Sequence, residues 1–368
     1  MVRDDLQDVV DEVARLLAAP ATLEDVDFTL VAYAAHPLED GDVPAMDAVR
    51  TRSILGRGST PATRRWFEDL GIARARGPLR TPADPGAGIL TRLLLPVRHA
   101  DRTLGYLWLL DGGRTDPADE GDPALAAAVS LAARAGEILA RRQEEDDDGA
   151  ALAALLGGPA AGRERAAAAL AARFDGAGVA LVALRPAGGA PPSGWRPPAG
   201  AAVVGDEVAV AVRLPRPGDP RPAGAAAAAA LARLPAGSSA GVAEPATAVA
   251  DLPGRWAQAR SAAAVAAVVP RLAPVASWAE LGGWRTAAAM AAPDPAVAPL
   301  LAEPALAATA EAYLDTAGSV ARTSAALGIH RQTLYYRLAR ITALTGLDLA
   351  DGDTRLLVHA SLRRARLP

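Results

Sequence analysis

Hydrophobic residues near the N-terminus recur with the period of an α-helix. They occupy one face of residues 4–17, and Pro20 ends the pattern. The face consists of Leu6, Val9, Val10, Val13, Leu16 and Leu17. Residues 28–33 then alternate like a strand, and residues 60–70 read as a helix with Pro61 in its first turn. The start of the chain therefore predicts helices and strands mixed within one domain.

Two further apolar runs, residues 92–98 and 103–110, are separated by a short turn and predict a β-hairpin. Residues 123–142 form the next predicted helix, with an apolar seam spaced by four and three residues in turn. The seam consists of Leu125, Val129, Ala132, Gly136 and Leu139. Such a seam suits a contact between two parallel helices, and burial within one subunit explains it equally well. The acidic run 144–148, followed by Gly149, predicts a solvated linker.

Residues 150–292 predict a second domain of mixed structure. An alanine-rich helix is followed by a strand from Gly178 and by a hairpin that turns near Gly205. A helix over 223–234, a short strand and another helix complete the pattern. The closely spaced prolines at 293, 295 and 299 then predict a second linker.

The pattern near the C-terminus predicts two helices joined by a tight turn, over residues 318–346. Ser319 is placed to cap the first helix, and Gly328 ends it because glycine adopts the left-handed conformation freely. The second helix begins near Arg331. Its buried stripe consists of Leu334, Leu338 and Ile341. A supporting helix over 304–314 precedes this pair.

The outward face of the second helix combines basic, amide, hydroxyl and aromatic side chains. No carboxylate occurs between Asp315 and Asp348. The outward residues are His330, Arg331, Gln332, Thr333, Tyr335, Tyr336, Arg337 and Arg340. An exposed helix that is rich in arginine and free of acid suits a polyanion, and the arrangement predicts a helix-turn-helix. A hairpin used only for packing would not require such a face.

The run GSVARTSAALGIHRQTLYYRL, residues 318–338, resembles the C-terminal DNA-binding segment of PucR/CdaR-type bacterial transcriptional regulators. That segment is similar to the Fis-type helix-turn-helix. The resemblance implies that the residues just after the turn reach base edges and phosphates. Those residues are His330, Arg331, Thr333, Tyr335 and Tyr336. Gln332 stands where most of these regulators carry asparagine, so the contact made from that position differs here.

Charge is distributed unevenly along the 368 residues, a length that predicts two or three domains. The whole chain carries a net charge of −4, yet residues 304–368 hold eight arginines against five carboxylates, a net charge of +3. The preceding part therefore carries −7. An acidic body with a basic terminal module fits a protein that docks DNA through one end. Without cysteine the chain has no disulfides and no thiolate metal sites.

These observations predict an α+β multidomain protein. Residues 1–143 are expected to form a GAF/PAS-like sensor that ends in a linking helix, and residues 303–368 an all-α helix-turn-helix domain. The element order in residues 150–292 resembles a GGDEF-like α/β domain of the degenerate class found in PucR/CdaR regulators. The acidic N-terminus is unlike a signal peptide, and no charge-free run of 18 apolar residues occurs. We expect a cytoplasmic protein without membrane contact.

Two motifs resemble parts of enzyme active sites, but the neighbouring residues or elements that such a site also needs are absent. Val204 replaces the first glycine of a GGDEF site in the sequence VGDEV, and no acidic residue on the neighbouring strand completes a metal site. The sequence GSSAG, residues 237–241, matches a nucleophile elbow but follows a helix instead of a strand. The histidines show no ligand spacing. We expect no catalysis, no cofactor and no metal.

The predicted function is sequence-specific binding of double-stranded DNA by a transcription factor that pairs as a homodimer on a palindromic site. Arg331 is expected to contact guanine and Gln332 adenine. Arg322, Arg337 and Arg340 are expected to bind phosphate. The N-terminal domain is expected to sense a small molecule or a partner. The alternatives are a partner-binding adaptor and a nucleotide-processing enzyme.

A ligand pocket in the N-terminal domain is one interpretation of three features of the sequence. Residues 53–58, SILGRG, combine a hydroxyl, an arginine and two glycines. Trp66 and Arg80 are further candidates for lining such a pocket. The other interpretation, that these residues only close the fold, requires no ligand.

Overall fold

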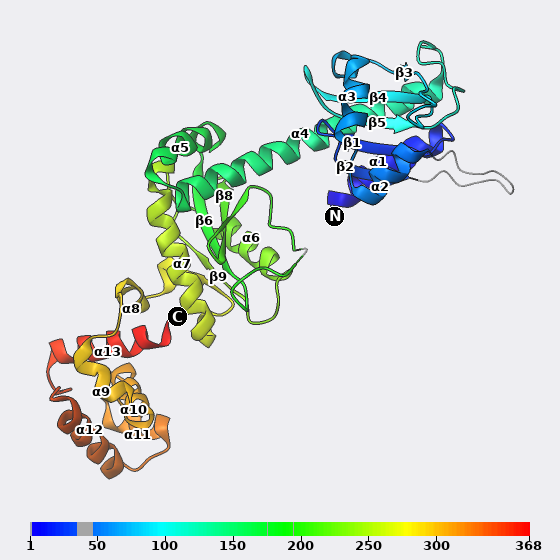
Figure 1. The fold of residues 1–368 in the computed structure, drawn as a ribbon. Coiled ribbons are helices and arrows are strands. Elements are labelled where there is room, and N and C mark those ends of the chain that lie inside the picture. The colour runs from blue at the N-terminus through cyan, green and yellow to red at the C-terminus, as the bar shows by residue number, and fades with distance from the viewer. Residues whose placement is uncertain (1, 35–46, 175, 194) are drawn as a thin grey trace. The chain divides into compact units, whose positions relative to one another are not determined.

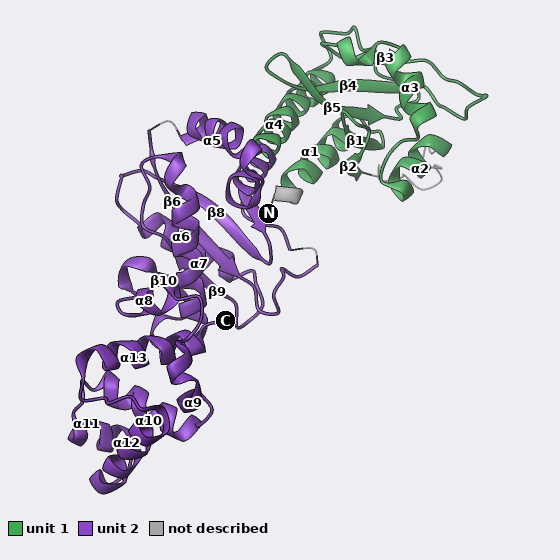
Figure 2. Ribbon diagram, turned by 60° about the vertical axis from the view of Figure 1, so that its left-hand side comes forward, with its two compact units in different colours: residues 1–144 green, residues 145–368 purple. Residues whose placement is uncertain are grey.

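The computed structural model describes residues 2–34, 47–174, 176–193 and 195–368. The chain divides into two compact units, residues 1–144 and 145–368 (Figure 2). Both units combine helices with a five-stranded sheet, and unit 2 ends in a cluster of helices without strands (Figure 1). The mixed α+β class with an all-helical C-terminal part is confirmed.

Unit 1 contains five strands and four helices among its described residues, the last helix continuing past the unit boundary. The helices are α1 (Val2–Leu16), α2 (Ala48–Gly56), α3 (Pro61–Asp69) and α4 (Pro123–Gly157). The strands are β1 (Ala21–Asp25), β2 (Leu30–Ala34), β3 (Leu79–Thr81), β4 (Arg92–His99) and β5 (Arg102–Leu109). The sheet order is β2-β1-β5-β4-β3, and all neighbouring strands are antiparallel.

The two faces of this sheet bury different kinds of side chain. Because side chains alternate along a strand, Leu107 and Leu109 of β5 face a core shared with α1 and α4, and Tyr106 and Trp108 face a second core. The second core is aromatic: the Phe67 ring on α3 lies 4.5 Å from the Trp108 ring. The helix at the N-terminus, the helix capped by Thr60 and the hairpin β4–β5 are thereby confirmed.

Strand β1 is absent from the sequence predictions, and its composition explains why. Ala21 and Leu23 pack in the apolar core, but Thr22 and Glu24, on the opposite face, are also buried. Buried polar residues remove the apolar signal that marks a strand with two covered faces. The predicted strand over 28–33 begins later than expected, since Phe28 sits in a turn with φ of 61°.

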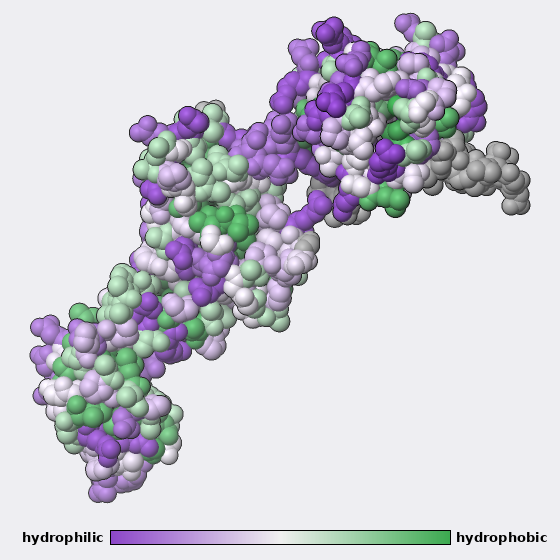
Figure 3. Space-filling view, in the orientation of Figure 1, coloured by the Kyte–Doolittle hydropathy of each residue, from purple (hydrophilic) through white to green (hydrophobic). Residues whose placement is uncertain are grey.

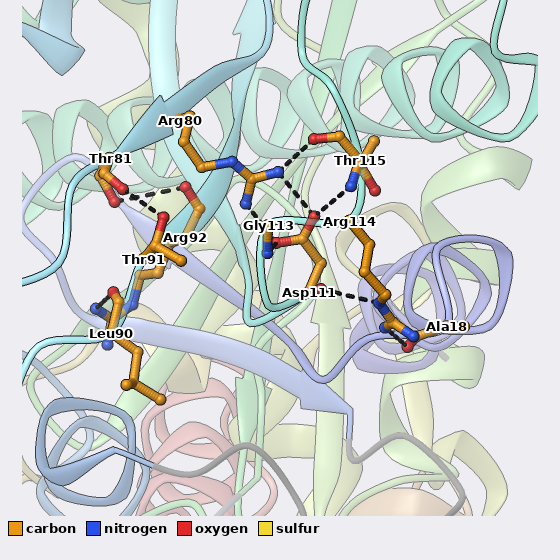
Figure 4. Close-up of polar contacts among 10 residues, drawn as sticks. All are labelled: Ala18, Arg80, Thr81, Leu90, Thr91, Arg92, Asp111, Gly113, Arg114 and Thr115. Atoms are coloured by element: carbon orange, nitrogen blue, oxygen red, sulfur yellow. Dashed lines mark hydrogen bonds and ion pairs between the residues drawn. The ribbon is translucent and has the colours of Figure 1, made fainter.

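A buried carboxylate ties the end of β5 to β3 (Figure 4). Asp111 accepts hydrogen bonds from Arg80 Nη2 at 2.8 Å and from the backbone N–H groups of Thr115 at 3.0 Å and Gly113 at 3.2 Å. Burial alone would raise the pKa of Asp111, but the Arg80 guanidinium and these N–H groups outweigh burial and lower it to about 2.

The lowered pKa of Asp111 makes the stability of unit 1 depend on pH. The stabilisation is present above the ordinary pKa of an aspartate and is lost as pH falls toward 2, a change of about 2 kcal/mol in the free energy of unfolding. Urea unfolding of the wild type and of Asp111→Asn, at pH values from 6 down to 2.5, measures this pH dependence of the free energy of unfolding. The variant is expected to lack this part of the pH dependence, whereas Asp119→Asn, at an exposed position, should retain it. Equal slopes in all three proteins would contradict the assignment.

Helix α4 contains the acidic run that the sequence predicts to be a linker. Residues 144–148 lie inside the helix, which continues to Gly157. Gly149 lies inside the helix, and a Cβ at that position would lie 2.6 Å from the Ala201 carbonyl oxygen. The missing side chain lets the helix lie against the end of a strand. The predicted spacer is therefore helical, and the flanking alanines favour that state.

The apolar seam of α4 is only partly buried in unit 1. Leu125, Ala132 and Gly136 are buried, whereas Val129 is exposed. Burial within one subunit, one of the two interpretations, therefore accounts for most of the seam. Among the described residues, α4 is also the one helix whose length and mean hydropathy, 1.3 over 18 residues, would suit a membrane span. One third of that stretch is buried, and α4 contributes Leu125, Ala128, Ala132, Ala135 and Ile138 to the core of unit 1.

The strands of unit 2 form a sheet with helices on both faces. The strands are β6 (Gly178–Arg185), β7 (Ala201–Val204), β8 (Glu207–Leu214), β9 (Ser239–Val242) and β10 (Val275–Ser277). Their order is β10-β9-β6-β8-β7, and only β9 and β10 are parallel. The main helices here are α5 (Ala160–Phe174), α6 (Arg221–Leu231), α7 (Leu252–Val268) and α8 (Trp284–Ala289). Strand β10 was not predicted, since three residues carry too little periodicity.

Alternate side chains of β6 pack into two different apolar cores, one on each face of the sheet. Val179, Leu181 and Ala183 face the end of α4, α5 and α7, whereas Val182 and Leu184 face α6. Gly241 on β9 allows close packing of α7, because a Cβ there would lie 2.0 Å from the Ala259 carbonyl oxygen. The alanine-rich composition follows from this packing, since small side chains let helices approach a sheet closely.

Candidate nucleic-acid interface

The C-terminal helices pack around one small apolar core. They are α9 (Ala298–Leu301), α10 (Pro304–Asp315), α11 (Val320–Leu327), α12 (Arg331–Thr345) and α13 (Gly352–Arg366) (Figure 1). The buried members of the core are Val297, Leu300, Leu306, Ala310, Ile341, Leu349, Val358 and Leu362. Asp351 caps α13 by accepting a hydrogen bond from the Thr354 N–H at 2.7 Å.

The turn between α11 and α12 has the geometry that its residues predict. Ser319 Oγ accepts a hydrogen bond from the Arg322 N–H at 3.4 Å, and Gly328 has a φ of 62°. His330 occupies the cap position of α12, where its Nδ1 accepts a hydrogen bond from the Gln332 N–H at 3.3 Å. Gly346, with a φ of 73°, ends the helix. These caps fix both ends of α12 without using any outward side chain beyond His330.

Helix α12 buries a narrow stripe and exposes the rest. Leu334 and Ile341 are fully buried, and Leu338 is partly buried. Most of the predicted contact residues are exposed, and the two tyrosines remain 56% and 65% accessible despite their size. The exposed residues are His330, Arg331, Gln332, Thr333, Tyr335, Tyr336 and Arg340. Exposed aromatic side chains cost free energy in water unless a partner covers them, so this face is suited to a ligand.

Two of the predicted arginines make contacts within the module. Arg322 is exposed, and its Nη2 donates to the Thr316 carbonyl oxygen at 2.7 Å. Arg337 is half-buried, and its Nη1 donates to Thr309 Oγ1 at 3.1 Å. Arg337 therefore connects α12 to α10, a contact that the sequence did not predict. The guanidinium has further N–H donors with which Arg337 can bind a ligand at the edge of the outward face of α12.

The acidic residues of α10 are held by α13. Arg366 Nη1 lies 2.7 Å from Glu311 Oε1, and Asp315 Oδ1 lies 2.9 Å from Arg363 Nη2 and 2.9 Å from His359 Nε2. Burial lowers the pKa of His359. Because these carboxylates are neutralised by neighbouring arginines, they do not offset the positive charge of α12. Hydrophilic patches mark the surface of the C-terminal helices (Figure 3).

The structure adds two residues to the outward face that sequence reasoning missed. Ala339 and Ala343 are exposed on the side of α12 away from its buried stripe. Their spacing from Tyr336, three and seven residues, places them on the same surface, which is a signal the sequence already contained. They were overlooked because alanine carries no recognisable chemistry. Their small size leaves the backbone of α12 accessible.

One residue of each enzyme-like motif makes contacts within the fold. Ser239 is buried in β9, and its Oγ donates to the Ala263 carbonyl oxygen at 2.9 Å. Glu207 is buried at the start of β8, where its carboxylate forms ion pairs with Arg260 and, at 3.5 Å, with Arg185. Neither group is available as a nucleophile or metal ligand in this geometry. Within the described ranges, no three His, Asp or Glu side chains form a group that could hold a metal ion.

Comparison with known proteins finds similarity in the C-terminal module. Residues 306–364 match the PucR C-terminal helix-turn-helix domain family. The chain is 61% identical over 41 residues to the carbohydrate diacid regulator of Escherichia coli (strain K12), covering 11% of each chain. It is 27% identical over 116 residues to the DNA-binding transcriptional activator AdeR of Bacillus subtilis (strain 168), covering 30% of this chain and 26% of AdeR. The matches thus span a minor part of both relatives.

The chain is also similar to a solved structure, the regulator of polyketide synthase expression from Bifidobacterium adolescentis. It is 15% identical, and the match covers 60% of this chain and 93% of that one with a TM-score of 0.25. A TM-score this low supports no conclusion about the fold. The sequence matches confirm the resemblance to PucR/CdaR-type regulators, which the helix-turn-helix residues carry.

Proposed function

We propose that this chain is a sequence-specific DNA-binding transcriptional regulator that inserts α12 into a major groove. The observation that carries the proposal is the outward face of α12, which is exposed, free of carboxylates and bordered by arginines. The match of residues 306–364 to the PucR C-terminal helix-turn-helix supports it. A helix of this width fits the major groove, where each base pair presents a distinct pattern of donors and acceptors.

Each outward residue has a role that follows from its chemistry. Arg331, in the first turn, would donate two hydrogen bonds to guanine, and Gln332 would pair with adenine. Thr333 and Tyr336 suit a phosphate or a thymine methyl group. Arg322, Arg337 and Arg340 would contribute affinity through the DNA backbone, and His330 and Tyr335 would reach a phosphate or a base edge.

Replacing Arg331 with alanine is expected to weaken binding to the native operator by about 1–3 kcal/mol and to relax specificity at one base position. The operator would first be found by capturing genomic DNA fragments with the whole protein. Band-shift titrations of the wild type and the variant then measure affinity. Arg233→Ala removes an exposed arginine from the middle of the chain and serves as the matched control. Equal affinities of all three proteins for the operator would contradict the role of Arg331.

The salt dependence of binding distinguishes this proposal from a partner-binding adaptor. A protein that neutralises several phosphates releases counterions, so its affinity for DNA falls by about 10³-fold or more between about 50 and 200 mM salt when six or more phosphates are contacted. An adaptor whose terminal helices dock protein has no such requirement. Absence of any operator binding at low salt would reject the regulator proposal.

The remaining parts of the chain are assigned to control and assembly. Residues 1–143 are proposed to form a GAF/PAS-like sensor, which the antiparallel sheet of unit 1 supports. Residues 150–292 are proposed to form a degenerate GGDEF-like domain without catalysis, and residues 303–368 the DNA-binding domain. We expect a homodimer, because one module makes few base contacts. We also expect it to act in the cytoplasm. Sedimentation of the whole chain tests the dimer, and incubation with nucleoside triphosphates and Mg²⁺ tests the absence of turnover.

A further inference from the structure

The residues that suggested a ligand pocket in unit 1 make contacts within the fold. Ser53 donates a hydrogen bond to the buried Glu24 carboxyl, and Trp66 packs edge-on against a neighbouring aromatic ring. Arg80 binds Asp111. The polar space beside Glu24 has room for about one water molecule. These contacts favour the interpretation in which the residues close the fold.

Helix α13 of unit 2 takes part in two apolar cores at once. Val358 and Leu362, four residues apart on one face of the helix, are buried in the core of the C-terminal module, which consists of α9 to α13. Leu367, directly after the helix, is buried in a separate core built on α7 and α8. In both views α13 lies between α8 and the other helices of the module (Figures 1 and 2). This one helix therefore joins the module to the rest of unit 2.

The contact between α13 and α8 is centred on Trp284. Its ring is 5% exposed, and the guanidinium carbons of Arg363 and Arg366 lie 5.2 and 5.3 Å from the ring centroid. A guanidinium over the face of a tryptophan is attracted by the negative face of the ring, and tryptophan is the best of the aromatic residues in this role. The spacing of three residues places both arginines on the same side of α13. Two cations of one helix thus bind one ring of α8.

The same arginines also bind the body of the module and the end of α7. Arg366 Nη1 lies 2.7 Å from Glu311 Oε1 on α10, and its Nη2 donates to the Val268 carbonyl oxygen, at the end of α7, at 3.0 Å. Arg363 Nη2 lies 2.9 Å from Asp315 Oδ1, also on α10. The planar fork of an arginine can hold several acceptors in a fixed geometry. One guanidinium is therefore shared between the module and α7.

The segment that the sequence predicts to be a second linker, residues 293–299, is held against α13. Arg364 donates from Nε to the carbonyl oxygen of Met290 at 2.8 Å and from Nη2 to that of residue 291 at 3.1 Å. Ser361 is fully buried, and its Oγ accepts a hydrogen bond from the Asp294 N–H at 3.1 Å. The start of the predicted linker is thereby fixed by side chains that come from the far end of the module.

The module is consequently attached to the rest of unit 2 at two places. The chain enters the module at α9 and returns to the core of α7 and α8 at Leu367. A module that hangs on one flexible linker can take up many orientations. A second attachment at the other end of the same segment removes this freedom, so α12 keeps one orientation relative to α7 and α8.

We propose that α13 is a clamp that fixes the orientation of the C-terminal module, and of α12 within it, on the α7 and α8 surface of unit 2. Trp284, Arg363 and Arg366 are its positioning residues. The consequence for DNA rests on the proposed function: in a homodimer, two α12 helices of fixed orientation accept one separation of the two half-sites. Modules on flexible linkers would accept several. The clamp would thus contribute to specificity without touching a base.

A distance measurement in the whole chain tests the clamp without DNA. Because the chain has no cysteine, Ala343→Cys on α12 and Ala228→Cys on α6, both at exposed positions, carry spin labels at these two places alone. Pulsed electron spin resonance then gives the distribution of distances between the labels. We expect one narrow distribution in the labelled protein, and one that is broader by about twofold or more when Arg363→Gln and Arg366→Gln are combined with it.

The controls separate the clamp from a general loss of charge or of folding. Arg165→Gln with Arg233→Gln removes two exposed arginines elsewhere in unit 2 and is expected to leave the distribution narrow. Trp284→Ala removes the ring and keeps both arginines, and it is expected to broaden the distribution as the arginine variant does. If circular dichroism shows that Trp284→Ala does not fold, the arginine variant decides, since both of its side chains are partly exposed.

Band shifts test the consequence for DNA, a readout that a merely structural role would not move. Moving the half-sites of the operator apart by about five base pairs, half a helical turn, is expected to weaken binding of the wild type by about tenfold or more. The arginine variant is expected to lose less than about threefold, and both proteins should bind a single half-site equally.

Three results would overturn the clamp. They are a broad distance distribution in the labelled protein before any clamp residue is changed, a distribution that stays narrow in the folded clamp variants, and equal dependence of both proteins on half-site separation. If the chain binds no DNA at all, the proposed function fails, whereas the distance distributions still decide whether α13 holds the module.

Discussion

Replacing Asp47 with alanine is expected to lower the free energy of unfolding of unit 1 by about 3–5 kcal/mol, as removal of one partner from a buried ion pair does. Asp47 accepts hydrogen bonds from Arg92 Nη2 at 2.5 Å, from the Arg50 N–H at 2.7 Å and from the Leu90 N–H at 3.0 Å. It thus caps α2 and anchors that helix to β4. Its removal leaves the guanidinium of Arg92, which is 3% exposed, without its ion-pair partner.

Hydrogen exchange of the backbone amides of β4 and β5 measures this change within unit 1, independently of the stability of unit 2. Arg92→Met in the Asp47→Ala background is the informative control. It removes the buried guanidinium that has lost its ion-pair partner, so the double variant is expected to be more stable than Asp47→Ala alone. A single variant as stable as the wild type, or a double variant that is less stable than the single one, would contradict this account.

Replacing Gly241 with alanine is expected to destabilise unit 2 by about 3 kcal/mol or more, because overpacking against backbone cannot be relieved by a rotamer change. The added Cβ would lie 2.0 Å from the Ala259 carbonyl oxygen and 2.2 Å from the Ala263 nitrogen, both in α7. Either β9 or α7 must shift, and α7 packs against three strands of the sheet, β6, β9 and β10. Denaturant unfolding followed by far-UV circular dichroism records the loss.

Gly224→Ala is the matched control for this experiment. Gly224 lies within α6, and nothing lies within 4 Å of the position of an added Cβ. Alanine in a helix is favoured over glycine by about 0.5–1 kcal/mol, so this variant is expected to be slightly more stable than the wild type. If Gly241→Ala were to behave like Gly224→Ala, the close contact of β9 with α7 would not exist in solution.

The helix-turn-helix was predictable because its signals are local. Ser319 and Gly328 act as caps within a few residues of one another, and the buried stripe at Leu334 and Ile341 repeats with the helical period. Neither feature depends on distant parts of the chain. The exposure of Arg331 and Tyr336 follows from the same period. The contact of Arg337 with Thr309 does not, since it depends on how α10 crosses α12.

The polar interior of unit 1 was not predictable, and the reason is physical. Glu24 lies on a strand whose alternation is hidden by polar residues, and Arg50 and Trp108 come from elements that meet it only in the folded sheet. A buried arginine and a solvated arginine are identical in sequence. The helical state of residues 144–148 was missed for another reason, because an acidic run is compatible with either a spacer or an exposed helix.

The cap of α12 determines which proton His330 carries when its imidazole is neutral. Since Nδ1 accepts the hydrogen bond from the Gln332 N–H, the ring must be in the Nε2–H tautomer. The ring atom left for a ligand, Nε2, therefore carries the proton and is a hydrogen-bond donor. At a DNA surface it would pair with a phosphate oxygen or with the N7 or O6 of a purine, and it would be repelled by the exocyclic amino groups of adenine and cytosine. One backbone contact at the start of the helix thus limits the bases that this side chain tolerates.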